Sequence, residues 1–201
     1  MGKTYAAIDD KLAALVHGAP VYFVATAPLA AQGHVNCSPK GRDSLRVLGP
    51  RTLAWLDLPG SGAETIAHLR ENGRIVVMIC AFAGPPRICR FHGRGEVLTP
   101  AHPEFADLLG HFAPQPAVRS IIRVQVTRIA DSCGYGVPEM AVTGRRYETE
   151  NFVAKMPADG LRKYVRDNNA VSIDGLPALE DRDAEMVLVD RELAIDILAN
   201  K

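Results

Sequence analysis

Polar and hydrophobic residues alternate over several short stretches of this chain, a pattern typical of strands with one buried face. Runs bounded by Gly, Pro, Asn or Ser predict six strands, at 21–26, 34–39, 52–58, 74–82, 87–98 and 119–132. Apolar residues at helical spacing predict helices at 8–17, 64–72, 103–112 and 158–169. Strands and helices do not alternate regularly, which favours antiparallel pairing. We therefore expect a small closed or nearly closed barrel, because closure removes exposed sheet edges.

Two long neighbouring strands, 74–82 and 87–98, are separated by an Ala-Gly-Pro-Pro turn and predict an antiparallel hairpin. The first is apolar at every position after Arg74, which predicts burial on both faces. In the second, Gly93 and Gly95 fall on the core-side face. Glycines there predict a bend or a close approach of another backbone.

The length of 201 residues favours one domain over two. From about residue 134 to residue 201 the chain is richer in charge, Gly and Pro. We expect residues 1–201 to form a single domain, with this last third as a C-terminal extension over the barrel or over a partner subunit.

The charges balance, with 23 basic and 23 acidic residues and a pI near 7.0. This balance argues against nucleic-acid and membrane-surface partners, and favours a small-molecule ligand or a second copy of the chain. Asp9, Asp10 and Lys11 interrupt the apolar pattern near the N-terminus, and no stretch approaches the ~20 apolar residues of a membrane span. We therefore expect a cytoplasmic protein.

No cluster of metal-ligating or nucleophilic residues emerges. The cysteines at 37, 80, 89 and 133 lie far apart, so we expect free buried thiols and no metal site. The histidines are scattered, and His68, which sits among apolar helix positions, is expected to be structural.

The segment Ser61-Gly62-Ala63-Glu64 has two interpretations. It matches the capping box S-x-x-E, in which Ser61 and Glu64 close the first turn of a helix. The same helix start offers amides and a positive dipole end to a phosphate, near Gly62 and Thr65. The Lys of a P-loop is missing, so this segment alone does not distinguish a capped helix start from a phosphate site.

A second candidate lies in "HVNCSPKGRDS". In a strand, Asn36 and Ser38 share a face, and Lys40 lies just beyond on the turn. This arrangement suits a phosphorylated or electron-rich ring ligand, although Ser-Pro-Lys-Gly is also ordinary turn chemistry. Arg87, at the start of its strand, is placed to reach a ligand at the barrel rim, or else belongs to a solvated strand face.

The motifs "HVNCSPKG", "LAWLDLPGSGAETIAHLRENGRIVVMICAFAGPPRICRFHGRGEV", "DSCGYGVPEM" and "SIDGLPAL" occur in an order that closely resembles the pyridoxamine 5'-phosphate oxidase-like flavoproteins. The resemblance runs from roughly residue 5 to residue 180. It implies the FMN-binding split-barrel fold, a mainly β, six-stranded antiparallel barrel with flanking helices. It further implies a homodimer with two non-covalent FMN sites at the subunit interface.

By motif, the resemblance implies these cofactor-binding residues: Asn36, Ser38 and Lys40 along the flavin ring and ribityl chain, Ser61, Gly62 and Thr65 at the phosphate, and Arg87 near the flavin. Residues around 133–135 would reach the site of the second subunit.

The function that the resemblance implies is FMN-dependent oxidoreduction of an unidentified small molecule by hydride transfer. A non-catalytic flavin carrier on the same fold, or a protein that holds deazaflavin or haem, is the alternative. The sequence also departs from the namesake enzyme. Gly62-Ala63 replaces an Arg-Lys pair, and Trp55 is the only tryptophan. These departures argue against pyridoxamine 5'-phosphate as the substrate.

Overall fold

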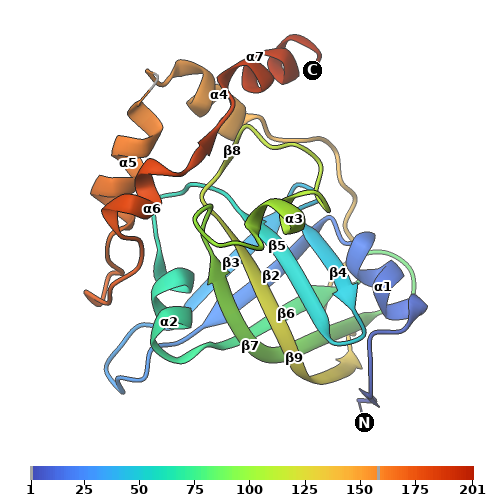
Figure 1. Ribbon diagram of the computed structural model, residues 1–201. Coiled ribbons are helices and arrows are strands. Elements are labelled where there is room, and N and C mark those ends of the chain that lie inside the picture. The colour runs from blue at the N-terminus through green and yellow to red at the C-terminus, as the bar shows by residue number, and fades with distance from the viewer. Residues whose placement is uncertain (1, 158) are drawn as a thin grey trace.

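The computed structural model of the chain describes residues 2–157 and 159–201. Its main body is an eight-stranded antiparallel sheet that curls into a half-open barrel (Figure 1). Neighbouring strands follow the order β3-β2-β6-β7-β9-β5-β4, and β1 pairs with β9 beside this path. The predicted fold class, a mainly β split barrel with flanking helices, is confirmed.

The barrel strands overlap the predicted runs, and β1 and β4 are additions to them. The strands are β1 (Thr4–Tyr5), β2 (Val21–Thr26), β3 (Asn36–Gly41), β4 (Leu45–Gly49), β5 (Thr52–Asp57), β6 (Arg74–Cys80), β7 (Arg87–Leu98), β8 (Ala117–Val118), β9 (Ser120–Cys133) and β10 (Leu188–Val189). The helices are α1 (Asp10–His17), α2 (Glu64–Asn72), α3 (Phe105–Leu109), α4 (Glu148–Lys155), α5 (Gly160–Asn169), α6 (Asp181–Glu185) and α7 (Arg191–Ala199). Ala158, where one helix was predicted to begin, lies outside the described residues.

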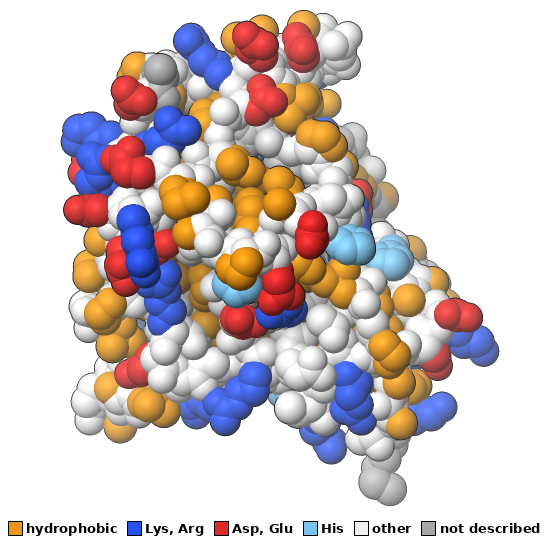
Figure 2. Space-filling view, viewed as in Figure 1, with side chains coloured by type: hydrophobic (Ala, Val, Ile, Leu, Met, Phe, Trp, Pro, Cys, Tyr) orange, Lys and Arg blue, Asp and Glu red, His pale blue; other side chains and the backbone are white. Residues whose placement is uncertain are grey.

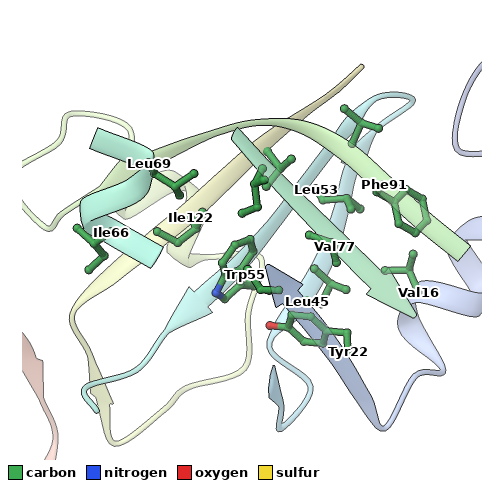
Figure 3. Close-up of a cluster of buried hydrophobic side chains, with 14 of the residues drawn as sticks. Val16, Tyr22, Leu45, Leu53, Trp55, Ile66, Leu69, Val77, Phe91 and Ile122 are labelled. Atoms are coloured by element: carbon green, nitrogen blue, oxygen red, sulfur yellow. The ribbon is translucent and has the colours of Figure 1, made fainter. Parts of the chain in front are cut away.

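The barrel interior holds the main hydrophobic core (Figure 3). Trp55 from β5 and Tyr22 from β2 are fully buried, and their rings meet edge to face with centroids 6.4 Å apart. Aliphatic side chains from β6, β9 and α2 fill the space around them. Inward-facing apolar positions of the strands therefore supply this core, while Ala54, Leu56, Leu98 and Ile121 belong to a second cluster packed with α3.

The outer face of β6 corrects one prediction. Ile75, Val77 and Ile79 are buried, but Val76 and Met78 between them are only half-buried. The reason is that one face of the curled sheet points into the barrel, while the helices of this chain do not fully cover the other.

The glycines of β7 behave as predicted. The register with β9 shifts between His92 and Gly93, which marks a bulge. A Cβ atom on Gly93 would lie 2.3 Å from the carbonyl oxygen of Gln125. One on Gly95 would lie 2.6 Å from the Leu69 side chain of α2. These glycines let β9 and α2 pack closely against β7.

The strand predicted at 34–39 lies two residues further along. β3 pairs with β2 from Asn36 opposite Thr26 to Gly41 opposite Val21. Lys40, predicted just beyond the strand, is therefore inside it and shares a face with Asn36 and Ser38. The proline within β3 is tolerated because β3 is the last strand on its side of the sheet.

The C-terminal helices gather at one end of the barrel (Figure 1). β10 pairs with β8, which ties this part of the chain to the segment that precedes β9. Several of its side chains belong to the main core cluster, namely Val165, Ala178, Leu179, Ala184 and Val187. These contacts support the proposal that residues 1–201 form one domain, with 134–201 as an extension over the barrel.

On the face shown in Figure 2, acidic and basic side chains are interspersed, so this face has no continuous field of one sign. None of the helices in the described ranges, 2–157 and 159–201, has the length and apolar character needed to cross a bilayer.

The four cysteines differ from the prediction of buried thiols. Cys80 and Cys89 are buried, whereas Cys37 and Cys133 are exposed. Burial raises the pKa of Cys89 to about 11, so its thiol stays protonated at neutral pH. Cys37 is exposed because it points away from the barrel, between the inward-facing Asn36 and Ser38.

Candidate functional site

Three of the predicted site residues form one hydrogen-bonded group where β3 meets α2. The Asn36 side-chain amide donates to the Thr65 hydroxyl at 3.0 Å. The Ser38 hydroxyl donates to the Asn36 carbonyl oxygen at 3.1 Å. All three side chains are partly or fully buried. The amide of Asn36 is thus fixed on both sides and presented on the inner face of β3.

This group extends inward to His68 of α2. The Asn36 amide lies 3.4 Å from the Thr26 hydroxyl, which lies 2.9 Å from His68 Nδ1. If Thr26 accepts from Asn36, its own proton goes to Nδ1, and the ring proton of His68 is on Nε2. Within the described residues, that buried Nε2 atom has no hydrogen-bond partner. Burial also lowers the pKa of His68, which favours the neutral ring.

The ammonium group of Lys40 points to a buried ionic cluster. Its Nζ atom lies 3.5 Å from an Asp57 carboxylate oxygen. Asp57 also accepts from Arg119 Nε at 2.6 Å and from the Ser120 hydroxyl at 3.0 Å. Burial alone would raise the pKa of Asp57, but the charges and hydrogen bonds around it outweigh burial and hold that pKa below its usual value. Two cations share one carboxylate, so the cluster keeps one excess positive charge.

Arg119 and Asn169 hold the loop before α2 in place through hydrogen bonds to its backbone. Arg119 Nη1 donates to the Gly62 carbonyl at 2.9 Å and to the Asn169 side chain at 2.7 Å. The Asn169 amide in turn donates to the Gly60 carbonyl at 3.0 Å. Both Arg119 and Asn169 are buried. The loop is therefore fixed by one residue next to β9 and one residue of α5.

The predicted capping box does not form. α2 begins at Glu64, with Ala63 in the N-cap position and no side-chain cap among the described residues. Ser61 lies too far upstream to cap, because the loop continues through Gly62 and Ala63. The Glu64 carboxylate instead accepts from the Ile173 amide at 3.4 Å. The N-terminal amides of α2 thus lack the side-chain acceptor that the sequence predicted.

The segment that follows α5 crosses the outer side of this site. Asp174 accepts from the His34 backbone amide at 2.8 Å and contacts His34 Nδ1 at 2.7 Å. The hydrogen bonds from His34 lower the pKa of Asp174. Together with the contacts of Asn169 and Ile173, this pair ties residues 169–174 to both loops around the site.

Arg87 is not part of this group. It donates to the Tyr5 hydroxyl at 2.6 Å and to the Asp131 carboxylate at 3.2 Å. Tyr5 also donates to Asp131 at 2.5 Å. In the part of the chain that the structure describes, no hydrogen bond or ion pair joins Arg87 to the other six predicted residues. Ser61 is exposed on the loop, next to Gly62.

The sequence interpretation missed several residues of the site. His68 was expected to be only structural. The residues that were not singled out are Thr26, Asp57, Arg119, Asn169 and Asp174. One signal was available, since an Asp at the end of an apolar strand, such as Asp57, requires a buried partner.

Comparison with known proteins identifies the family. The family model described as pyridoxamine 5'-phosphate oxidase matches residues 8–133, more than half of the chain. The chain is also 35% identical over 192 residues to the pyridoxamine 5'-phosphate oxidase family protein ustO of Aspergillus flavus, an alignment that covers 87% of this chain and 77% of that protein. This chain belongs to the pyridoxamine 5'-phosphate oxidase family. The matched region of this family member runs from α1 to the end of β9, and Asn169 and Asp174 lie outside it.

Solved structures give more distant similarities to this pyridoxamine 5'-phosphate oxidase family member. A putative pyridoxamine 5'-phosphate oxidase from Lactobacillus delbrueckii is 16% identical, with 63% of this chain and 98% of that chain covered and a TM-score of 0.48. HupZ of Group A Streptococcus is 21% identical, with 61% and 91% covered and a TM-score of 0.47. An FMN-binding protein from Syntrophomonas wolfei is 15% identical, with 59% and 82% covered and a TM-score of 0.44.

Proposed function

We propose that this protein is an FMN-binding flavoprotein that acts as an oxidoreductase on a small molecule. Family membership supports FMN as its cofactor. The observation that carries the proposal is the group of Asn36, Ser38 and Thr65 assembled beside Lys40 and the uncapped start of α2.

The donors of this site fit the chemistry of FMN. A phosphate requires amides and positive charge, which the start of α2 and the excess charge of the Lys40 cluster supply. A polar ring edge requires fixed polar groups, which Asn36 and Ser38, held by their mutual hydrogen bond on the inner face of β3, supply. FMN, when bound, supplies hydride transfer.

In this scheme the protein residues bind and orient the cofactor, and they exclude water from it. Asn36 and Ser38 orient a ligand along β3, and the cation of Lys40 favours an electron-rich state of that ligand. Residues 169–174 shield one side of the site from solvent. Arg87 forms its own cluster with Tyr5 and Asp131. The role that we propose for it near the flavin rests on the resemblance alone.

Two further properties complete the proposal. We propose a cytoplasmic homodimer with FMN at the subunit interface, and the half-buried apolar residues Val76 and Met78 on the outer face of β6 are compatible with a covering subunit. Pyridoxamine 5'-phosphate is not the proposed substrate, because Gly62-Ala63 stands where the resemblance gives the namesake enzyme an Arg-Lys pair, and Trp55 is the only tryptophan.

Ser61→Asp tests phosphate binding at the loop. A carboxylate at this exposed position repels a phosphate, so we expect FMN affinity to fall by about tenfold or more. Ser61→Asn, which has nearly the same shape without the charge, is the matched control and should bind within about twofold of the original protein. Fluorescence titration of FMN measures both variants. Equal FMN affinities of the two folded variants would refute phosphate binding at this loop.

Turnover is tested separately from binding. The FMN-loaded protein should oxidise a reduced nicotinamide or another donor, and hydrogen peroxide should form when oxygen is the acceptor. An absorbance spectrum identifies the bound chromophore directly. FMN binding without turnover of any donor would assign the protein to the flavin carriers instead. A deazaflavin or haem spectrum would show that the cofactor is not FMN.

Glu64→Gln is expected to strengthen FMN binding. The Glu64 carboxylate folds back over Gly62, where a Cβ atom would lie 2.2 Å from its Oε2 atom. This charge opposes a phosphate at the same helix start, so its removal should raise FMN affinity by up to about fivefold. The loss of a favourable helix-dipole interaction should lower the free energy of unfolding by about 0.3–1 kcal/mol. Calorimetric titration and chemical denaturation measure the two effects, and weaker FMN binding by the variant would contradict this prediction.

A further inference from the structure

A cavity lies beside the turn between β3 and β4. Its volume is about 640 Å³, which is in the range of small-molecule sites. One wall is Pro20 with Arg42 of the turn, and the other is the chain from Val142 to Thr149. That chain rises from the end of β9 along the barrel to α4 (Figure 1). Arg42, which lines the cavity, follows Lys40 of the candidate flavin site by two positions in the sequence.

Buried Glu150 fixes the cationic side of this cavity. Its carboxylate accepts from Arg42 Nη1 at 3.2 Å, from Arg42 Nη2, and from Arg145 Nη2 at 2.6 Å. Burial alone would raise the pKa of Glu150, but the hydrogen bond from Arg42 and the charges of both arginines outweigh burial and lower that pKa. Glu150 is thus ionised and holds two guanidinium groups in place.

The cavity keeps an excess of positive charge. Its lining includes Arg42, Arg145 and Arg146, against the carboxylates of Glu148 and the adjoining Glu150. Arg146 forms no ion pair within the described residues, and its side chain is exposed at the cavity. The Nε atom of Arg42 is buried without a hydrogen-bond partner there. One guanidinium charge therefore remains for a ligand.

Each wall of the cavity also carries an apolar residue. Pro20 and Val142 line the cavity, and Val142 is 70% exposed to solvent. A ligand with an apolar body would cover these carbon surfaces while its charged end meets Arg146. The shape and charge together describe an amphipathic anion.

We infer that this cavity binds a small organic acid, with its single carboxylate on Arg146 and its apolar body against Pro20 and Val142. This acid would be the substrate of the proposed oxidoreductase, because the cavity adjoins the end of β3. That part of the inference rests on the proposed function. The planar fork of one guanidinium matches either a carboxylate or a phosphate. A carboxylate is favoured because its single charge equals the excess charge of the cavity.

Binding of benzoate by the full-length protein tests this inference. Calorimetric titration should show that benzoate binds, whereas the uncharged benzamide and the doubly charged phenyl phosphate bind more weakly. Arg146→Ala should weaken benzoate binding by at least about tenfold, because it removes a charge-assisted hydrogen bond. Arg182→Ala, at an arginine with a 75% exposed side chain, is the matched control and should leave benzoate binding unchanged.

The outcomes separate this inference from the proposed function. Benzoate is titrated without FMN, and FMN affinity is measured on Arg146→Ala in a separate titration, where we expect a change of less than about twofold. Equal binding of benzoate and benzamide, tighter binding of phenyl phosphate, or unchanged benzoate affinity in Arg146→Ala would overturn the carboxylate site. Failure to bind FMN would instead overturn the proposed function and leave the carboxylate site standing.

Discussion

Asp57→Asn should lower the free energy of unfolding by about 3–5 kcal/mol, because it leaves the buried guanidinium of Arg119 without its counter-charge. The Asp57 side chain is 1% exposed and that of Arg119 4% exposed, so water cannot replace the lost carboxylate. Urea denaturation followed by intrinsic fluorescence measures the effect. The single tryptophan, Trp55, lies on the same strand, β5, and reports unfolding of the barrel.

The matched control is an exposed ion pair in the same sheet. Glu96 contacts Arg123 at 2.7 Å, but its side chain is 52% exposed. Glu96→Gln should therefore change the free energy of unfolding by less than about 1 kcal/mol. Similar losses in the two variants would show that burial does not set the strength of the Asp57 pair.

The same carboxylate predicts a pH dependence. The folded protein holds the pKa of Asp57 below the value of about 3.9 of an unfolded chain. Its stabilising contribution is therefore complete above about pH 4 and is lost as pH falls through the folded pKa. Asp57→Asn should consequently flatten the fall in stability below about pH 4. An unchanged acid profile in the variant would contradict the depressed pKa.

Asn169→Ala should destabilise the protein by about 2–4 kcal/mol, because it leaves Arg119 Nη1 and the Gly60 carbonyl each without one partner. It should also weaken FMN binding by about tenfold, since the loop before α2 loses its support. Denaturation and FMN titration measure the two effects.

Two variants refine this prediction. Asn169→Asp retains the acceptor for Arg119 but loses the donor to Gly60, so its effect on FMN should persist while part of the stability returns. The neighbouring Asn168 is exposed and donates only within its own helix, to the Tyr164 carbonyl, which makes Asn168→Ala the matched control. An FMN affinity of Asn169→Ala equal to that of Asn168→Ala would show that the loop needs no support from α5.

The fold was predictable because its information is local. Alternation along 87–98 and 119–132 gave the long strands, and glycines on one face gave the close approach at β7. The shared face of Asn36 and Ser38 followed from the same two-residue period. The strand at Leu45–Gly49 was missed because it is short and lies next to a turn with two non-glycine residues in the left-handed region.

The ionic part of the site was not predictable from the sequence. Arg119 contacts Asp57, which is 62 residues away in the sequence, and Asn169, which is 50 residues away. No local pattern encodes such distant pairs. The capping box failed for a related reason. The motif from Ser61 to Glu64 specifies suitable residue types, but packing and the loop contacts of Arg119 decide where α2 begins.

The support of the loop by Asn169 also has a consequence for synthesis. The ribosome completes β9 well before it adds α5, so a nascent barrel already contains Asp57 and Arg119 while Asn169 does not yet exist. Strand pairing can proceed at that stage, because it needs only residues already made. The loop before α2 gains the support of Asn169 only after α5 has been added, so we expect the proposed cofactor binding to follow synthesis of α5 rather than of the barrel.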